Sequence, residues 1–207
     1  HAIILEDLLD LINVMKAFGR ELPKHWVKTS CRMMEWLQMM CHPDGGIALF
    51  NDAAFQIAAS QQELFDYGRR IDLPFRQCEP TGLTHFEESG YISYHTAEAA
   101  AFLDVAQIGP DYLPGHAHAD TLNFELSLFG TRVIVDSGTS CYGTSRERLR
   151  QRGTAAHNTV MIDGEDSSEV WSGFRVARRA RPVGLEIDEI EGVTTIRCCH
   201  DGYQRLP

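Results

Sequence analysis

Apolar residues recur at intervals of three and four along the first part of the chain, which places them on one face of a helix. The first such run covers residues 3–18 and ends at Gly19. The second begins at Pro23, a residue favoured in a first helical turn, and ends near Cys41. We predict a further helix over residues 53–65. The N-terminal part is therefore predicted to be helical.

From about residue 85 the apolar residues follow the two-residue alternation of β-strands. In residues 122–128 the apolar side chains occupy the even positions and Asn123, Glu125 and Ser127 the odd positions. This alternation is typical of a half-buried antiparallel strand, with its apolar side toward the core and its polar side toward water. The other predicted strands are 91–95, 101–105, 131–135, 158–162, 174–181, 184–188 and 193–199.

Helices followed by a series of strands indicate an α+β chain with segregated parts. We place a helical part at residues 1–43, a junction at 44–84 and an antiparallel β domain at 85–207. No closing element is apparent at the end of the sequence, so we expect the β domain to be incomplete. The chain also lacks an initiator Met, and we expect a preceding part.

The composition narrows the class of protein. The 207 residues are 43% hydrophobic and 23% charged, as in an ordinary globular domain. No apolar run approaches the roughly 20 residues of a membrane span, and no cationic segment marks a secretory signal at the start. The formal net charge of −10 argues against nucleic acid as a partner. Six cysteines show no spacing typical of zinc ribbons or disulfide frameworks.

Positive charge nevertheless gathers in two places. Four arginines alternate with other residues between 146 and 152, and four more lie between 175 and 181. Such clusters allow an acidic protein to bind an anionic polymer locally. The alternative is a solvated charged loop, which is common for such runs.

The candidate chemistry lies in a few histidines and aspartates. His116 and His118 occupy alternate positions leading into a strand and so share a face. Asp136 ends the next apolar strand, and His157 precedes another predicted strand. Imidazole and carboxylate together suit zinc and similar divalent metals. Asp120 is the competing carboxylate, which could instead orient one of the histidines.

A paired HxH also occurs in cupins, small metal-binding β-barrels. A cupin would need Glu four or five residues after the second His, where this chain has Leu122 and Asn123. Glu125 is displaced from that position, so the cupin interpretation is disfavoured.

Several motifs occur together in a fixed order. They are PGHAHAD at 114–120, VIVDSGT at 133–139, RGTAAHNTV at 152–160, WSGFR at 171–175 and the junction PDGGIALFND at 43–52. In this combination the chain resembles the heparinase II/III-like polysaccharide lyases, which include related alginate lyases.

The resemblance implies the last helices of an α/α toroid, followed by an antiparallel β-sandwich-like domain. It further implies that His118, Asp136 and His157 bind zinc, while His116 faces the sugar cleft and takes part in catalysis. It also implies an acidic polysaccharide as substrate and a periplasmic or secreted location.

The reaction implied by the resemblance is β-elimination at a uronic acid, in which a base removes the C5 proton and an acid protonates the departing oxygen. The remaining catalytic groups are expected in helices upstream of this chain. We select Tyr142 as a catalytic candidate and Arg152 as a substrate-binding candidate, because Arg suits a carboxylate or sulfate. Both could alternatively anchor loops. A non-catalytic glycan-binding β domain with a structural zinc is the rival hypothesis.

Overall fold

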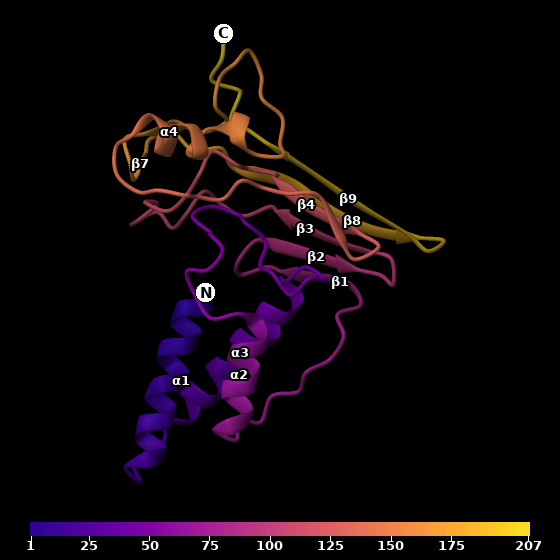
Figure 1. Ribbon diagram of the computed structural model, residues 1–207. Helices are drawn as coiled ribbons and strands as arrows, with labels where there is room; N and C mark the ends of the chain where they lie inside the picture. Colours follow the sequence, from indigo (N-terminus) through magenta and orange to yellow (C-terminus); the bar gives the residue numbers. More distant parts are fainter.

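The computed structural model describes all 207 residues and shows a group of helices beneath a set of antiparallel strands (Figure 1). The helical layer consists of α1 (Ala2–Ala17), α2 (Lys24–Met39) and α3 (Gln61–Arg70). Their apolar faces form one core, which includes Leu5, Leu9, Ile12, Met34, Leu37, Leu64 and Phe65. None of the helices has the length and apolar character that crossing a bilayer requires.

The third helix lies later in the chain than the predicted helix over 53–65, so that prediction was wrong in position. Gln56 has a φ of 62°, a left-handed conformation that a helix cannot accommodate. The helix begins after Ser60, whose hydroxyl accepts from the Glu63 backbone N–H while the Glu63 carboxylate accepts from the Ser60 N–H. This capping box is visible in the sequence as Ser-x-x-Glu.

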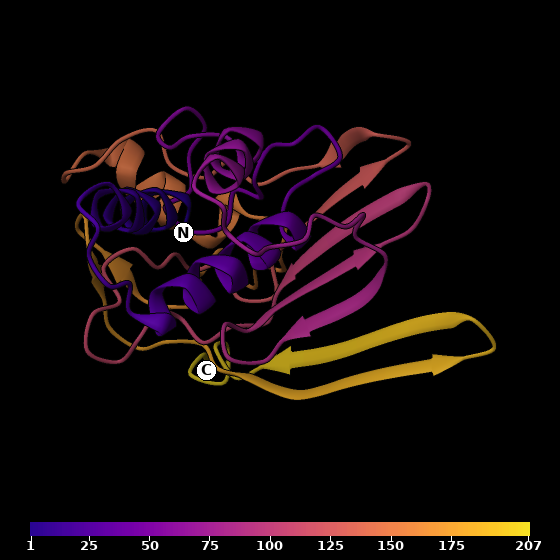
Figure 2. The same ribbon diagram turned by 90° about the horizontal axis from the view of Figure 1, so that it is seen from below.

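The main sheet has five antiparallel strands that neighbour one another in chain order. The strands are β1 (Gly82–Phe86), β2 (Tyr91–His95), β3 (Ala99–Asp104), β4 (Phe124–Leu128) and β5 (Thr131–Ile134). Seen from below, they extend to one side of the helices (Figure 2). A short helix α4 (Arg146–Arg152) and the small pair β6 (Val170–Trp171) and β7 (Arg175–Val176) follow.

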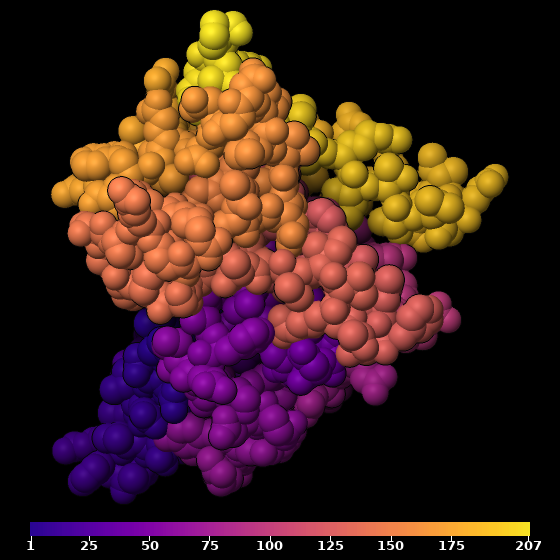
Figure 3. Space-filling model, turned by 45° about the horizontal axis from the view of Figure 1, so that its top comes forward, coloured from indigo at the N-terminus to yellow at the C-terminus, as the bar shows by residue number.

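A long hairpin of β8 (Pro182–Ile190) and β9 (Val193–His200) comes near the end of the chain. The space-filling view shows it standing apart from the main body of the molecule (Figure 3). The predicted strand 174–181 is shortened to the two residues of β7. The predicted strand 158–162 is absent, because side-chain bonds hold this segment instead: Asn158 bonds to Asn123 and to the Phe124 carbonyl.

The buried face of β4 is its polar face, contrary to the expected alternation. Glu125 is fully buried, whereas Phe124 on the opposite face is 37% exposed. Glu125 pairs with Phe102 across the sheet, and both lie on the side that receives the junction. The sequence pattern predicts the two-residue period correctly but assigns the wrong face to the core. The polar face can be buried because its side chains find hydrogen-bond partners in a distant segment of the chain.

Those partners come from the segment that follows α2 and leads into the junction. His42 contacts the Glu125 carboxylate through Nε2 at 2.7 Å and the Ser127 hydroxyl through Nδ1 at 2.6 Å. The second Glu125 oxygen accepts from the Leu49 backbone N–H at 2.6 Å. All of these groups are buried, so the helical layer and the sheet are joined by a satisfied polar network.

We expect Glu125→Gln to lower the free energy of unfolding by about 2 kcal/mol, because the amide NH₂ would face groups that donate and a charge-assisted bond would be lost. Urea unfolding measures this, with the exposed Glu87→Gln as the matched control. Equal stability of the two variants would contradict a role for this network in joining the layers.

Candidate active site and metal-binding cluster

The candidate site lies where three loops meet the junction. The β3–β4 loop carries His116, His118 and Asp120, and its Ala119 N–H bonds to the carbonyl of Arg152 at the end of α4. The segment after β5 bonds to the junction through the Thr139 N–H and the Ala53 carbonyl. Residues that are far apart in the sequence are thereby fixed beside one another.

Three buried side chains form a potential metal-binding cluster. One ligand atom from each of His118, Asp120 and His157 lies within 4.8 Å of the others. His118 Nδ1, Asp120 Oδ2 and His157 Nε2 are buried and have no hydrogen-bond partner. Because buried polar atoms are rarely left unpaired, three such atoms at one point fit a bound cation.

The opposite nitrogen of each histidine is held by a carboxylate. His118 Nε2 lies 2.8 Å from Asp52 Oδ1, and His157 Nδ1 lies 2.7 Å from Asp136 Oδ2. This arrangement fixes the ring orientation and tautomer so that the open nitrogens face one another, as in carboxylate–histidine–metal sites.

The two aspartates occupy places different from those expected. Asp136, which we predicted as a ligand, accepts from His157 and Asn123 at one oxygen and from the Gly138 N–H at the other. Asp120, which we placed in a supporting position, presents the open oxygen. The geometry therefore favours Asp120 as the ligand and Asp136 as the group that orients His157.

The cluster concentrates buried negative charge. Burial raises the pKa of Asp120, and burial together with the Asp120 charge raises the pKa of Asp104 well above its usual range. Burial lowers the pKa of His157, but its bond to Asp136 and the charge of Asp120 outweigh this and raise it. A divalent cation here would compensate for carboxylates that are costly to bury when ionised.

Asp52 connects this cluster to the surface. Its carboxylate accepts from His118 Nε2, from His116 Nδ1 at 2.8 Å and from both terminal nitrogens of Arg148. Burial alone would raise the pKa of Asp52, but the bonds from His118, Arg148 and His116 lower it to about 2. Asp52 is therefore an anion throughout the physiological pH range.

The two histidines of the HxH pair have separate environments. The His118 side chain is fully buried, whereas the His116 side chain is 69% exposed. His116 lines a cavity of about 870 Å³, and Tyr142 lines another of about 680 Å³. The Tyr142 and Phe174 rings each lie 6.2 Å from the His116 ring. With Nδ1 bonded to Asp52, His116 keeps Nε2 available for a ligand.

Tyr142, selected from the sequence as a catalytic candidate, lies beside His116 on the exposed side of the site. Partial burial and the Asp52 charge raise the pKa of its hydroxyl, against the opposing effect of Arg148. The hydroxyl carries its proton at neutral pH, as an ordinary tyrosine does, so it has a proton to donate.

Arg148 was not recognised from the sequence as a site residue. It is fully buried, and its two terminal nitrogens donate to the Asp52 carboxylate. Its Nε donates to the Gly173 carbonyl at 3.0 Å, and its guanidinium lies over the Tyr142 and Phe174 rings. The 146–152 segment, for which we left open an anion-binding cluster or a solvated charged loop, is the helix α4, which Ser145 caps. The four-residue spacing of Arg148 and Arg152 was the available signal that both share one helix face.

Arg152 is not placed where it could contact substrate, which corrects our expectation for this residue. Its guanidinium is fully buried and donates to the carbonyls of Ala117, Trp171 and Ser172. It anchors the loop that presents His116 and His118.

Comparison with known proteins agrees with this architecture. Residues 79–207 match the family described as heparinase II/III-like, C-terminal. The fold is similar to a crystal structure of heparinase III, with 17% identity and a TM-score of 0.66 over 95% of this chain and 36% of that one. It is also similar to the heparan sulfate lyase HepC from Pedobacter heparinus, with 17% identity and a TM-score of 0.71 over 99% of this chain and 33% of that one.

At these identities the structural likeness concerns the fold, and the chain spans about a third of the length of the solved relatives. None of the curated proteins compared with the chain matches it. The family match covers the β3–β4 loop, α4 and the segments that carry the potential metal cluster. The chain therefore belongs to the heparinase II/III-like, C-terminal family.

Proposed function

We propose that the chain is part of a polysaccharide lyase that cleaves a uronic-acid-containing polysaccharide by β-elimination. One observation carries the proposal: His116 is exposed at a cavity, oriented by the Asp52 carboxylate and flanked by Tyr142. We further propose that α1, α2 and α3 belong to an α/α toroid, whose other helices complete the cleft.

The arrangement suits proton transfer. Asp52 holds the Nδ1–H of His116, so Nε2 is the available basic atom and the resulting imidazolium is stabilised by the carboxylate. His116 Nε2 is placed to exchange a proton with the sugar, and the protonated Tyr142 hydroxyl can supply a proton to the departing glycosidic oxygen. Neutralisation of the uronate carboxylate is expected from groups elsewhere in the complete cleft.

We propose zinc at the buried cluster, held by His118, Asp120 and His157, with Asp136 positioning His157. Nitrogen and oxygen donors of this kind suit zinc. When bound, the ion would neutralise the buried carboxylate and link the β3–β4 loop to the segment after α4. Burial of all three side chains favours a structural role.

The substrate class is inferred from the arginine clusters of this chain and from its similarity in fold to a solved lyase. One solved relative of similar fold is a heparan sulfate lyase, and this chain gathers arginines locally despite its acidic total. We infer an acidic polysaccharide of the heparan sulfate type, with alginate as the alternative uronate polymer.

The test uses the full-length protein that contains this chain. It is mixed separately with heparan sulfate, heparin, hyaluronan and alginate, and the ultraviolet absorbance of an unsaturated uronate product is followed. We expect absorbance to rise with a sulfated substrate. No rise with any of these polymers would overturn the lyase proposal.

A second candidate is a non-catalytic glycan-binding domain with a structural zinc. It is favoured by the complete burial of the proposed ligand set, which needs no substrate to explain it. Glycan binding without any unsaturated product would support this alternative.

A further inference from the structure

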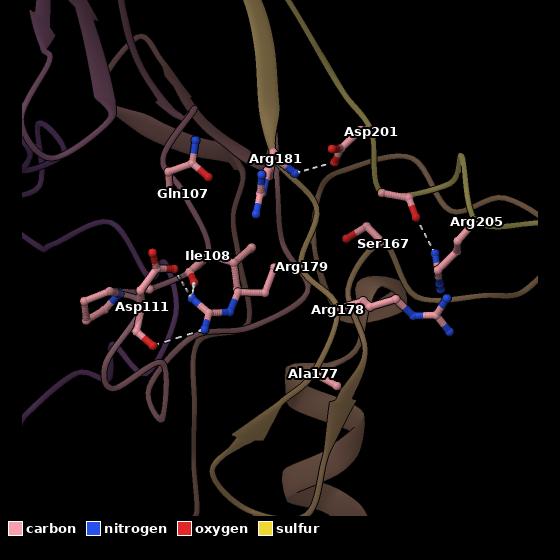
Figure 4. A pocket seen from close by; sticks show the side chains of 13 residues that line it. Gln107, Ile108, Asp111, Ser167, Ala177, Arg178, Arg179, Arg181, Asp201 and Arg205 are labelled. Carbon is pink, nitrogen blue, oxygen red and sulfur yellow. Dashed lines mark hydrogen bonds and ion pairs between the residues drawn. The ribbon is translucent and has the colours of Figure 1, made fainter.

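A third cavity lies against the β3–β4 loop. It has a volume of about 930 Å³ and is enclosed by the loop at 107–111, the segment 177–181 and the chain end at 201–205 (Figure 4). Four arginines line it, namely Arg178, Arg179, Arg181 and Arg205, and we refer to it as the arginine pocket. The lining includes two carboxylates, Asp111 and Asp201, so cations exceed anions in a chain of net charge −10.

Two of the four arginines have carboxylate partners. Arg178 pairs with Glu169, and Arg179 pairs with Asp111 at 3.0 Å. The Asp111 side chain is fully exposed, so solvent weakens that pair. The Arg179 pair attaches the segment 177–181 to the loop at 107–111, and the cavity keeps its excess of positive charge.

The other two arginines have no carboxylate partner. Arg205 donates to the carbonyls of Gly202 and Asp166, which fixes its guanidinium but leaves its charge uncompensated. Arg181 uses its backbone N–H to bond Asp201, while its guanidinium makes no hydrogen bond or ion pair. Figure 4 shows the Arg181 side chain between Gln107 and Arg179, within the pocket. The Arg205 guanidinium is fixed but has no anionic partner, and the Arg181 guanidinium has all of its donors free, so together they suit an anion.

The pocket adjoins the candidate active site. Residues 107–110 line both the arginine pocket and the cavity that contains His116. Arg179 holds this shared wall through the Ile108 and Asp111 carbonyls. A long ligand at His116 therefore has a cationic cavity next to it.

We propose that the arginine pocket binds a sulfate or carboxylate group of the acidic polysaccharide at a distance from the reacting bond. The inference rests on the proposed function, because it assumes that the ligand at His116 is an acidic glycan. Guanidinium groups bind planar or tetrahedral oxyanions through paired N–H donors, which explains arginine rather than lysine around the cavity.

The test measures binding of a fluorescent heparan sulfate octasaccharide to the 207-residue chain by anisotropy. Arg181 is exposed and structurally unpaired, so Arg181→Ala should fold normally. We expect it to bind about tenfold more weakly, the loss of one charge-assisted contact. Arg181→Lys should recover only part of the affinity. Arg20→Ala, an exposed arginine at the end of the helical layer, is the control of equal charge change and should bind as the unaltered chain.

Parallel titrations use an N- and O-desulfated octasaccharide and an alginate octasaccharide, which separate sulfate from carboxylate as the anchoring group. Equal affinity of the Arg181→Ala and Arg20→Ala chains would overturn the inference, and so would a lack of binding to all three oligosaccharides. If the full-length enzyme with Arg181→Ala cleaves the polysaccharide at an unchanged KM, the anion-binding role of the pocket is overturned and the lyase proposal is kept. If binding depends on Arg181 but no cleavage occurs, the lyase proposal is overturned and the anion-binding role of the pocket is kept.

Discussion

His118→Ala is expected to lose bound zinc and thermal stability together, with a large fall in Tm. The side chain is fully buried, and its open Nδ1 lies with Asp120 Oδ2 and His157 Nε2 in one cluster. Metal binding at a buried site contributes directly to folding, and the apparent contribution reaches about 10 kcal/mol in small zinc domains. Metal content by atomic emission and Tm by calorimetry provide the measurements, before and after treatment with a chelator.

Substitution of Asp120 and of Asp136 tests which of the two aspartates is the metal ligand. Asp120→Asn should lose the metal, whereas Asp136→Asn should retain it with an affinity about 10- to 100-fold lower, as for a group that orients a ligand. The exposed His25→Ala serves as the control and should keep full metal content. Retention of metal by Asp120→Asn and its loss from Asp136→Asn would contradict the assignment made from the geometry. Full metal content in His118→Ala would exclude the cluster as the binding site.

His116→Ala is expected to reduce kcat of the full-length enzyme by about 10²- to 10⁴-fold, the usual effect of removing a proton-transferring side chain. Metal content and Tm should remain near those of the unaltered protein, because the His116 side chain is largely exposed and contributes little packing. Initial rates of unsaturated-product formation provide the measurement, again with His25→Ala as the control. A normal kcat would exclude His116 from the chemistry, and a loss of metal would show that it is not separate from the cluster.

The period of the sequence pattern predicts much of the fold but not the direction in which a strand faces. The positions of α1, α2 and the strands β2 to β5 agree with the expected runs, because their apolar spacing is regular, whereas β1 was not expected. Strand β4 has the predicted alternation, yet Glu125 points inward. Its partner His42 lies 83 residues earlier, and a pattern within one strand contains no information about such a contact.

The candidate site shows the same limit. His116 and His118 could be identified as a pair from their spacing, but their different environments depend on Asp52, which is contributed by the junction. Arg152 and Arg148 look alike in a run of alternating charges, and only the helix α4 shows that both are buried. Residues whose role depends on burial by distant segments were the ones misassigned.

The contacts of the junction determine where this protein can be divided or recombined. Sequence pattern alone would place a domain cut near residue 84, which lies within β1, and that cut would also separate His42 from Glu125 and Asp52 from His116. A chimaera that exchanges the β part alone would then combine a foreign glutamate and a foreign histidine with this chain's His42 and Asp52. Exchange from His42 onward transfers both pairs intact, so the unit that evolution or an engineer can move as one piece begins just after α2, ahead of the predicted junction.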